Sequence, residues 1–287
     1  MGLFRSLFGS KPAVPTLWTY APGGVVWRMV PSEDGVLVGE DRYKEDKRVL
    51  FFCLDLRTGK ELWSRKSLEE PWWLGIEATH QGLVFVHEFA RPDMPEHTGI
   101  IALDLRTGDI RWMKKEMQFR GVRDGVILGR ERGALEDRFH LVKVENGEVL
   151  REVTAEDVSD FPGETAGEVS GRIRYPSCVS KDDAGWDSFE SVADTRRMVG
   201  ECEAVEVDER RIFCYHAGYE RHPEQSILEH RMVIVDARGR KVYEDILHDR
   251  AHLPVYDAFF VLDGRLCYVR KERELVCLDV AVGDGGT

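Results

Sequence analysis

The sequence has little positive charge for its length and contains no long apolar run. Its 40 Lys and Arg residues are outnumbered by 52 Asp and Glu residues, which gives a formal net charge of -12. Such a charge repels phosphate backbones and anionic headgroups, so we expect no nucleic-acid partner. No stretch approaches the roughly 20 apolar residues that a membrane-spanning helix needs. The sequence therefore predicts a cytoplasmic protein, with any membrane contact being peripheral.

The short motifs of common enzymes and metal sites are also missing. The six cysteines form no C-x-x-C pair, and the chain contains no G-x-S-x-G, no P-loop, no G-x-G-x-x-G and no H-E-x-x-H. Nucleophilic, nucleotide-dependent and zinc-dependent chemistry therefore have no motif in their favour. We predict no catalytic residue, no cofactor and no metal, and whether the chain is an enzyme stays open, with the balance against it.

Residues 1–12 differ from the rest of the chain. Large apolar residues stand beside basic ones in the sequence M-G-L-F-R-S-L-F-G-S-K-P. This pattern is compatible with a short amphipathic segment on a membrane surface or a partner, and equally with a disordered terminus. We assign residues 13–287 to one folded domain.

A ten-residue phrase occurs twice: L-D-L-R-T-G-K-E-L-W at residues 54–63 and L-D-L-R-T-G-D-I-R-W at residues 103–112. A second phrase, two apolar strands around an Asp- or Gly-containing turn, occurs five times. Its turn residues are separated by 47, 43, 85 and 54 positions, so the third gap is close to two repeats. The turn residues are Gly35, Gly82, Gly125, Arg210 and Gly264.

Each repeat contains four strand-like segments, and four strands in 40 to 50 residues are typical of a β-propeller blade. We predict an all-β, six-bladed propeller of four-stranded antiparallel blades, with seven blades as the alternative. The blades would start near Trp27, Ile76, Phe119, within residues 160–195, at Cys202 and near Val255. The blade in residues 160–195 is degenerate. The strand at residues 16–20 would complete the last blade and leave no exposed edge.

The two phrases ending at Trp63 and Trp112 resemble the repeat of the PQQ-like (quinoprotein dehydrogenase-like) propellers. That repeat has a small residue, Leu and Asp at the end of the third strand, then Thr-Gly and a Trp in the fourth. The match is strong in the first two repeats and fades afterwards. Adjacent cysteines, which catalytic members often carry, are missing, so the resemblance implies a non-catalytic member without PQQ.

The repeated residues suit structural roles. Asp55 and Asp104 can accept backbone N–H groups in the tight turn, and Gly59 and Gly108 can adopt its positive φ. Trp63 and Trp112, in the fourth strands, can pack between neighbouring blades. These residues are predicted to build the scaffold and not to act in catalysis.

Charged segments after the second strands are predicted to be long loops that form a binding face. The candidate binding residues in these loops are Glu40, Asp41, His87, Glu88, Arg130 and His216. Trp72 and Trp73, between two blades, either both pack in the core or offer one indole to a partner. Histidines 87, 97, 216, 222 and 230 could converge with Glu88 or Glu220 on a metal, but surface histidines are the commoner explanation.

We therefore interpret the chain as a monomeric, non-catalytic propeller that binds an unidentified protein partner. The alternative is a six-bladed metal-dependent lactonase or hydrolase, or a binder of small ligands. This alternative predicts carboxylates or imidazoles that converge from at least three blades. A third hypothesis is a former quinone-dependent dehydrogenase that has kept a ligand pocket.

Overall fold

The computed structural model describes residues 14–91, 94–133, 137–154, 158, 172–183, 185–218, 227–256 and 258–281. The chain forms two compact units. The N-terminal unit comprises Tyr20–Ile173 and Glu272–Leu275, and the C-terminal unit comprises Met1–Thr19, Arg174–Lys271 and Val276–Thr287. Among the described residues, no helix has the length and apolarity of a membrane span. The predicted N-terminal segment, residues 1–12, lies outside the described part of the chain.

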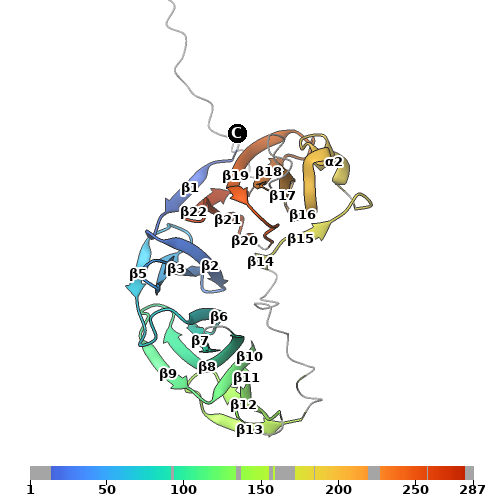
Figure 1. The fold of residues 1–287 in the computed structure, drawn as a ribbon. Coiled ribbons are helices and arrows are strands. Elements are labelled where there is room, and N and C mark those ends of the chain that lie inside the picture. Colours follow the sequence, from blue (N-terminus) through green and yellow to red (C-terminus); the bar gives the residue numbers. More distant parts are fainter. Residues whose placement is uncertain are drawn as a thin grey trace, which may run out of the picture. The chain divides into compact units, whose positions relative to one another are not determined.

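The N-terminal unit contains three successive antiparallel groups of four strands (Figure 1). The first sheet consists of β2 (Val25–Ser32), β3 (Val36–Tyr43), β4 (Arg48–Asp55) and β5 (Glu61–Lys66). The second group consists of β6 (Leu74–His80), β7 (Leu83–Arg91), β8 (Met94–Asp104) and β9 (Ile110–Lys114). The third consists of β10 (Met117–Arg123), β11 (Val126–Glu131), β12 (Phe139–Lys143) and β13 (Val149–Val153). One parallel bridge, Gln118 to Gly99, joins β10 to β8.

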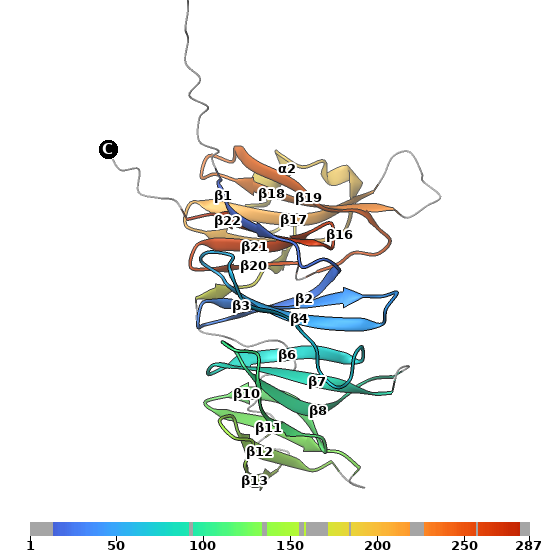
Figure 2. The ribbon, with the colours of Figure 1, turned by 90° about the vertical axis from the view of Figure 1, so that its left-hand side faces the viewer.

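The groups of strands bury their apolar faces against one another. One core cluster combines Val38 and Phe51 of the first sheet with Ile76, Val86 and Leu103 of the second group. Another cluster lies between the second and third groups and is built around Phe85, whose ring stacks on Phe119 at 5.6 Å. Figure 2 shows the three groups following one another within this unit, and the two clusters cover both faces of the middle group.

A tryptophan in the fourth strand connects each of the first two groups to the next. Trp63 Nε1 donates to the carbonyl of Leu105 at 3.0 Å, and Trp112 Nε1 donates to the carbonyl of Val144 at 2.9 Å. Each indole also covers a turn glycine of the next group. A Cβ on Gly108 would lie 2.9 Å from the Trp63 ring, and one on Gly147 would lie 2.8 Å from the Trp112 ring. These glycines are thus constrained by a neighbouring side chain as well as by their positive φ.

The repeated turns have the geometry expected from their residue types. Asp55 Oδ1 accepts hydrogen bonds from the Thr58 backbone N–H at 2.8 Å and from its hydroxyl at 2.6 Å. Asp104 Oδ1 accepts the N–H groups of Arg106 and Thr107 in the same way. Gly59 has φ of 69° and Gly108 has φ of 71°. The Asp, Thr and Gly residues of the phrase therefore specify the turn locally.

The C-terminal unit contains two further sheets. One consists of β15 (Ser177–Val179), β16 (Met198–Val207), β17 (Arg210–Gly218), β18 (Leu228–Val235) and β19 (Lys241–Ala251). The other contains β20 (Phe259–Leu262), β21 (Arg265–Arg270), β22 (Glu274–Asp279) and β1 (Thr16–Tyr20). The predicted pairing of the first strand with the last is present, since β1 borders β22 and Asp279 N donates to the Pro15 carbonyl at 2.9 Å.

The structure does not confirm the fourth predicted blade. The described part of residues 160–195 forms β14 (Ile173–Arg174), β15 and the short helix α2 (Trp186–Glu190), and no four-stranded group; a 3-10 turn, η1 (Thr195–Arg197), follows. The blade count of six is therefore not confirmed. The described residues are all-β, with several antiparallel sheets and no sheet that closes on itself.

The charged segments that were predicted to be loops begin within strands. Glu40 and Asp41 lie in β3, His87 and Glu88 in β7, Arg130 in β11 and His216 in β17. The sequence suggested loops because charged residues follow one another there. In the first of these segments, Arg42 of the same strand satisfies Glu40.

Candidate functional site

Three strands of the second group bring Glu77, His87 and His97 together. Glu77 lies in β6, His87 in β7 and His97 in β8. The register of β6 against β7 shifts between Ile76 and Ala78, so Glu77 is the extra residue of a bulge. A bulge turns a side chain away from the direction that regular alternation would give it. The first strands of the other two groups carry the same shift, at Trp27 and at Arg120.

Both imidazoles lie close to the same carboxylate oxygen of Glu77. Glu77 Oε1 lies 2.9 Å from Nδ1 of His87 and 2.9 Å from Nδ1 of His97. The two imidazole rings stack with centroids 3.5 Å apart and planes inclined by 8°. Glu77 and His87 are buried, whereas the His97 side chain is 30% exposed. The cluster is therefore open to solvent only on the His97 side.

Glu77 keeps its charge in spite of burial. Burial by itself raises the pKa of this carboxyl, but the two imidazoles of His87 and His97 close to it outweigh the effect of burial and lower the pKa to about 2. A carboxylate with such a pKa is ionised throughout the physiological range. The cluster thus places a permanent negative charge beside two imidazoles.

His87 is held firmly but lacks hydrogen bonds. Its Nδ1 is close to Glu77 but out of line for a hydrogen bond, and neither ring nitrogen has a partner although the residue is only 2% exposed. The edge of Phe89 meets the rings of His87 and His97 at 4.9 and 5.3 Å. A Cβ on Gly75 would lie 2.6 Å from His87 Cε1, so only glycine leaves room for the ring. A buried polar side chain without partners is costly unless something else satisfies it.

A buried ion pair lies next to this cluster. Glu40, 1% exposed, accepts two hydrogen bonds from Arg42, at 3.0 Å from Nε and 2.8 Å from Nη2. Its other oxygen accepts the backbone N–H of Ile76 at 2.7 Å. Arg42 also donates to the carbonyls of Trp72 and Leu74. Glu40 is therefore fully used within the fold, and it fixes the strand that carries Glu77.

Arg42 also contacts two indoles. Its guanidinium carbon lies 5.6 Å from the Trp27 ring centroid and 5.2 Å from that of Trp72. Trp72 and Trp73 are both half-buried and meet edge to face at 6.4 Å. Neither of the two is the fully exposed anchor that one hypothesis required. Trp27, which the sequence analysis did not select, is 62% exposed.

The C-terminal unit contains a second stacked pair of histidines. His216 and His230 face each other across β17 and β18, with ring centroids 4.0 Å apart. His230 Nε2 lies 3.1 Å from Cys214 Sγ, and His216 Nε2 accepts the N–H of Val255 at 3.1 Å. Burial, and then the other histidines, lower the pKa of His230 to about 3 and that of His216 to about 4. Burial also raises the pKa of the Cys214 thiol, so this thiol and the His230 imidazole are both neutral at pH 7.

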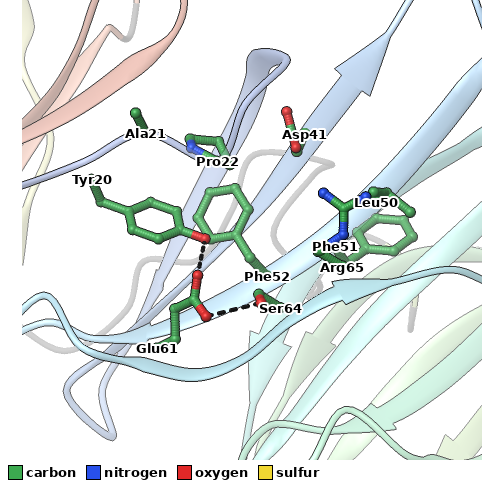
Figure 3. A pocket seen from close by; sticks show the side chains of 10 residues that line it. All are labelled: Tyr20, Ala21, Pro22, Asp41, Leu50, Phe51, Phe52, Glu61, Ser64 and Arg65. Atoms are coloured by element: carbon green, nitrogen blue, oxygen red, sulfur yellow. Dashed lines mark hydrogen bonds between the residues drawn. The ribbon is translucent and has the colours of Figure 1, made fainter.

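Asp41 lies in a small pocket of about 80 Å³ (Figure 3). The polar groups of this pocket satisfy one another. Tyr20 donates to Glu61 at 2.7 Å, Ser64 donates to the other Glu61 oxygen at 2.9 Å, and Asp41 accepts the Gly24 N–H at 2.8 Å. Ligand sites for small molecules usually measure roughly 300 Å³ or more. The pocket is thus too small and too well satisfied internally for a substrate site.

The other predicted site residues do not belong to the cluster of Glu77, His87 and His97. Glu88 is half-buried in β7 and pairs across the sheet with Leu74 and Thr98. Arg130 binds Asp137 at 2.5 Å and Gln118 at 3.1 Å. Residues 220 and 222 lie outside the described part of the chain. Sequence reasoning missed Glu77, although a single acidic residue inside the apolar strand L-G-I-E-A is a signal that could have revealed it.

A family model matches part of the chain, and solved structures resemble it at low TM-scores. The family model of a domain of unknown function (DUF4905) matches residues 30–112, which include the Glu77 cluster. No curated protein matches the sequence. BamB from Moraxella catarrhalis aligns with a TM-score of 0.34 at 11% identity, over 90% of this chain and 83% of that chain. A member of the DUF4221 family from Bacteroides vulgatus aligns with a TM-score of 0.40 at 9% identity, over 93% of this chain and 97% of that chain. These TM-scores are low, and the similarity carries no conclusion about function.

Proposed function

We propose that the chain is a non-catalytic β-propeller scaffold, monomeric and cytoplasmic, that binds a protein partner through the surface around Trp27. The repeated four-stranded groups and the pairing of β1 with β22 support a propeller, with six blades or seven. All six cysteines are unbridged, which suits a reducing compartment.

The exposed indole of Trp27 is the observation that carries this proposal. Trp27 is the extra residue of the bulge in β2. The Arg42 guanidinium packs against its ring, and the ion pair with Glu40 holds Arg42 in place. An aromatic side chain that is exposed yet held in place loses little conformational freedom on binding. Tryptophan and arginine are also the residues that most often dominate the energy of protein interfaces.

A metal-dependent hydrolase of the lactonase kind is less well supported. That alternative requires polar side chains that converge from at least three blades. The described residues instead bring Glu77, His87 and His97 together from one four-stranded group. The pocket in Figure 3 offers no catalytic arrangement either, because its carboxylates already bind donors within the fold.

Photo-crosslinking in the native host tests the scaffold proposal. A photoreactive amino acid replaces Trp27 in one protein and Ile110 in another, since Ile110 is 47% exposed on β9 of the same unit. We expect a discrete crosslinked partner from position 27 and none from position 110. The purified partner should then bind Trp27→Ala at least about tenfold more weakly than wild type, and Ile110→Ala equally well. Equal affinity for Trp27→Ala, or no crosslink at position 27 in any growth condition, would overturn the proposal.

A further inference from the structure

The cluster of Glu77, His87 and His97 has the composition of a metal site, whether or not the chain binds a partner. One atom from each residue, a carboxylate oxygen or an imidazole nitrogen, lies within 4.8 Å of the corresponding atoms of the other two. Three strands supply them, so the backbone fixes their separation. We propose that these three side chains bind one divalent transition-metal ion, with Zn²⁺ as the best match.

The state of His87 is the second observation that points to a ligand. Both of its ring nitrogens are buried without a hydrogen-bond partner, and Nδ1 faces the same oxygen of Glu77 that His97 contacts. A metal-binding histidine must offer an unprotonated ring nitrogen that no other group occupies. Neither ring nitrogen of His87 is engaged in a hydrogen bond, whereas an ordinary buried histidine donates or accepts within the fold.

The donor set selects the kind of ion. Two imidazole nitrogens and one carboxylate oxygen suit Zn²⁺ and neighbouring first-row ions, whereas Ca²⁺ and Mg²⁺ prefer oxygen alone. Bonds of about 2.0–2.2 Å place the ligand atoms of a tetrahedral Zn²⁺ site about 3.4 Å apart. The present Nδ1–Oε1 distances of 2.9 Å are shorter, so the side chains would separate by about half an ångström on binding.

The surroundings support the ligands and leave an entry. Phe89 and the backbone at Gly75 restrict the rotation of the His87 ring. The Ile76 N–H bound to Glu40 fixes the residue before Glu77. Because His97 is 30% exposed, an ion can reach the cluster from solvent. With three protein ligands, the fourth position would be open to water or to an external group.

Metal titration of the purified full-length chain tests the proposal. The protein carries Cys178→Ser, which removes the exposed thiol, and is treated with EDTA, freed of chelator and titrated with ZnCl₂ against a coloured chelator. We expect about one equivalent of tightly bound Zn²⁺ and a higher Tm with the metal than without it. Co²⁺ should give the visible absorption of a four-coordinate site.

Three variants decide which residues bind the ion. Glu77→Gln and His97→Ala should each lower the affinity by more than about tenfold and remove the Tm increase. His140→Ala is the matched control, because His140 Nε2 also lies 3.0 Å from a carboxylate, that of Glu131, but without a second histidine. It should bind as wild type does. Circular dichroism checks folding, and if Glu77→Gln does not fold, the more exposed His97→Ala decides. Binding well below one equivalent in wild type, or unchanged affinity in folded His97→Ala, would overturn the proposal.

Discussion

The two stacked histidine pairs of this protein have similar geometry and opposite electrostatics. In each, the two rings come from neighbouring antiparallel strands, β7 and β8 in one pair and β17 and β18 in the other. The pair in the N-terminal unit lies against Glu77, a carboxylate with a pKa of about 2. The pair in the C-terminal unit lies against a neutral thiol and has lowered pKa values. The neighbouring group, and not the stacking, decides whether a histidine pair attracts a cation or excludes a proton.

The largest expected effect is acid sensitivity caused by the C-terminal pair. The pKa values of His216 and His230, about 4 and about 3, lie below the value of 6.5 in an unfolded chain. Their contribution to stability is therefore complete above pH 6.5 and is lost as the pH falls from there towards 3. We expect a loss on the order of 4 kcal/mol in the free energy of unfolding between pH 7.5 and 5. Urea unfolding at both pH values measures it.

The double variant His216→Gln, His230→Gln tests where this pH dependence arises. Removing both imidazoles should flatten the decline between pH 7.5 and 5, while Glu77→Gln should leave it as it is in wild type. An unchanged decline in the double variant would show that other groups cause the acid sensitivity.

Glu77→Gln should have the next largest effect, at neutral pH. The folded pKa of Glu77 is below the ordinary value of 4.5, so its contribution is present above about pH 4.5 and is lost as the pH falls towards 2. Removing the charge should cost on the order of 3 kcal/mol in the free energy of unfolding at pH 7. Glu131→Gln, at the more exposed pair with His140, should cost less than about 1 kcal/mol. Equal effects of the two substitutions would contradict a special role of Glu77.

Gly75→Ala should disturb one histidine pair by steric contact alone. The new Cβ would lie 2.6 Å from Cε1 and 2.8 Å from Nε2 of His87, whose ring is packed between His97 and Phe89. We expect a cost of about 2 kcal/mol and weaker metal binding. Gly218→Ala, two residues after His216, meets its nearest atoms at 3.8 Å and should change stability by less than about 0.5 kcal/mol. Thermal unfolding of both variants separates crowding from loss of glycine itself.

The smallest effect concerns cysteine reactivity. Cys214 lies beside a histidine, as activated nucleophiles do, but burial raises its pKa and lowers that of His230. It should therefore react with iodoacetamide no faster than buried Cys267, while exposed Cys178 is labelled. Mass spectrometry of the native protein gives the rates. Rapid labelling of Cys214 would mean that the second pair is an activated Cys–His pair.

The sequence predicted features that depend on local patterns, and it did not predict contacts between residues far apart in the chain. The strands that begin near Trp27, Ile76 and Phe119 were expected because apolar alternation and turn residues are local signals. The charged segments after Glu40 and His87 were expected to be loops, because the sequence does not show that Arg42 binds Glu40 or that Glu77 lies beside His87. The Glu77 cluster depends on register shifts that bring residues 10 and 20 positions apart to one point. Alternation of side chains along a strand does not predict such shifts.

The Trp63 and Trp112 hydrogen bonds favour an origin of these repeats by tandem duplication. Each indole binds a carbonyl and covers a glycine in the repeat that follows it, so a repeat carries its own means of attachment to the next one. A tandem duplication of one such segment would create a copy that fits between its neighbours without new mutations. The third group has no tryptophan at the corresponding place in β13, V-L-R-E-V, and the repeat pattern fades from there on. Beyond that point, selection would have had to find each contact separately.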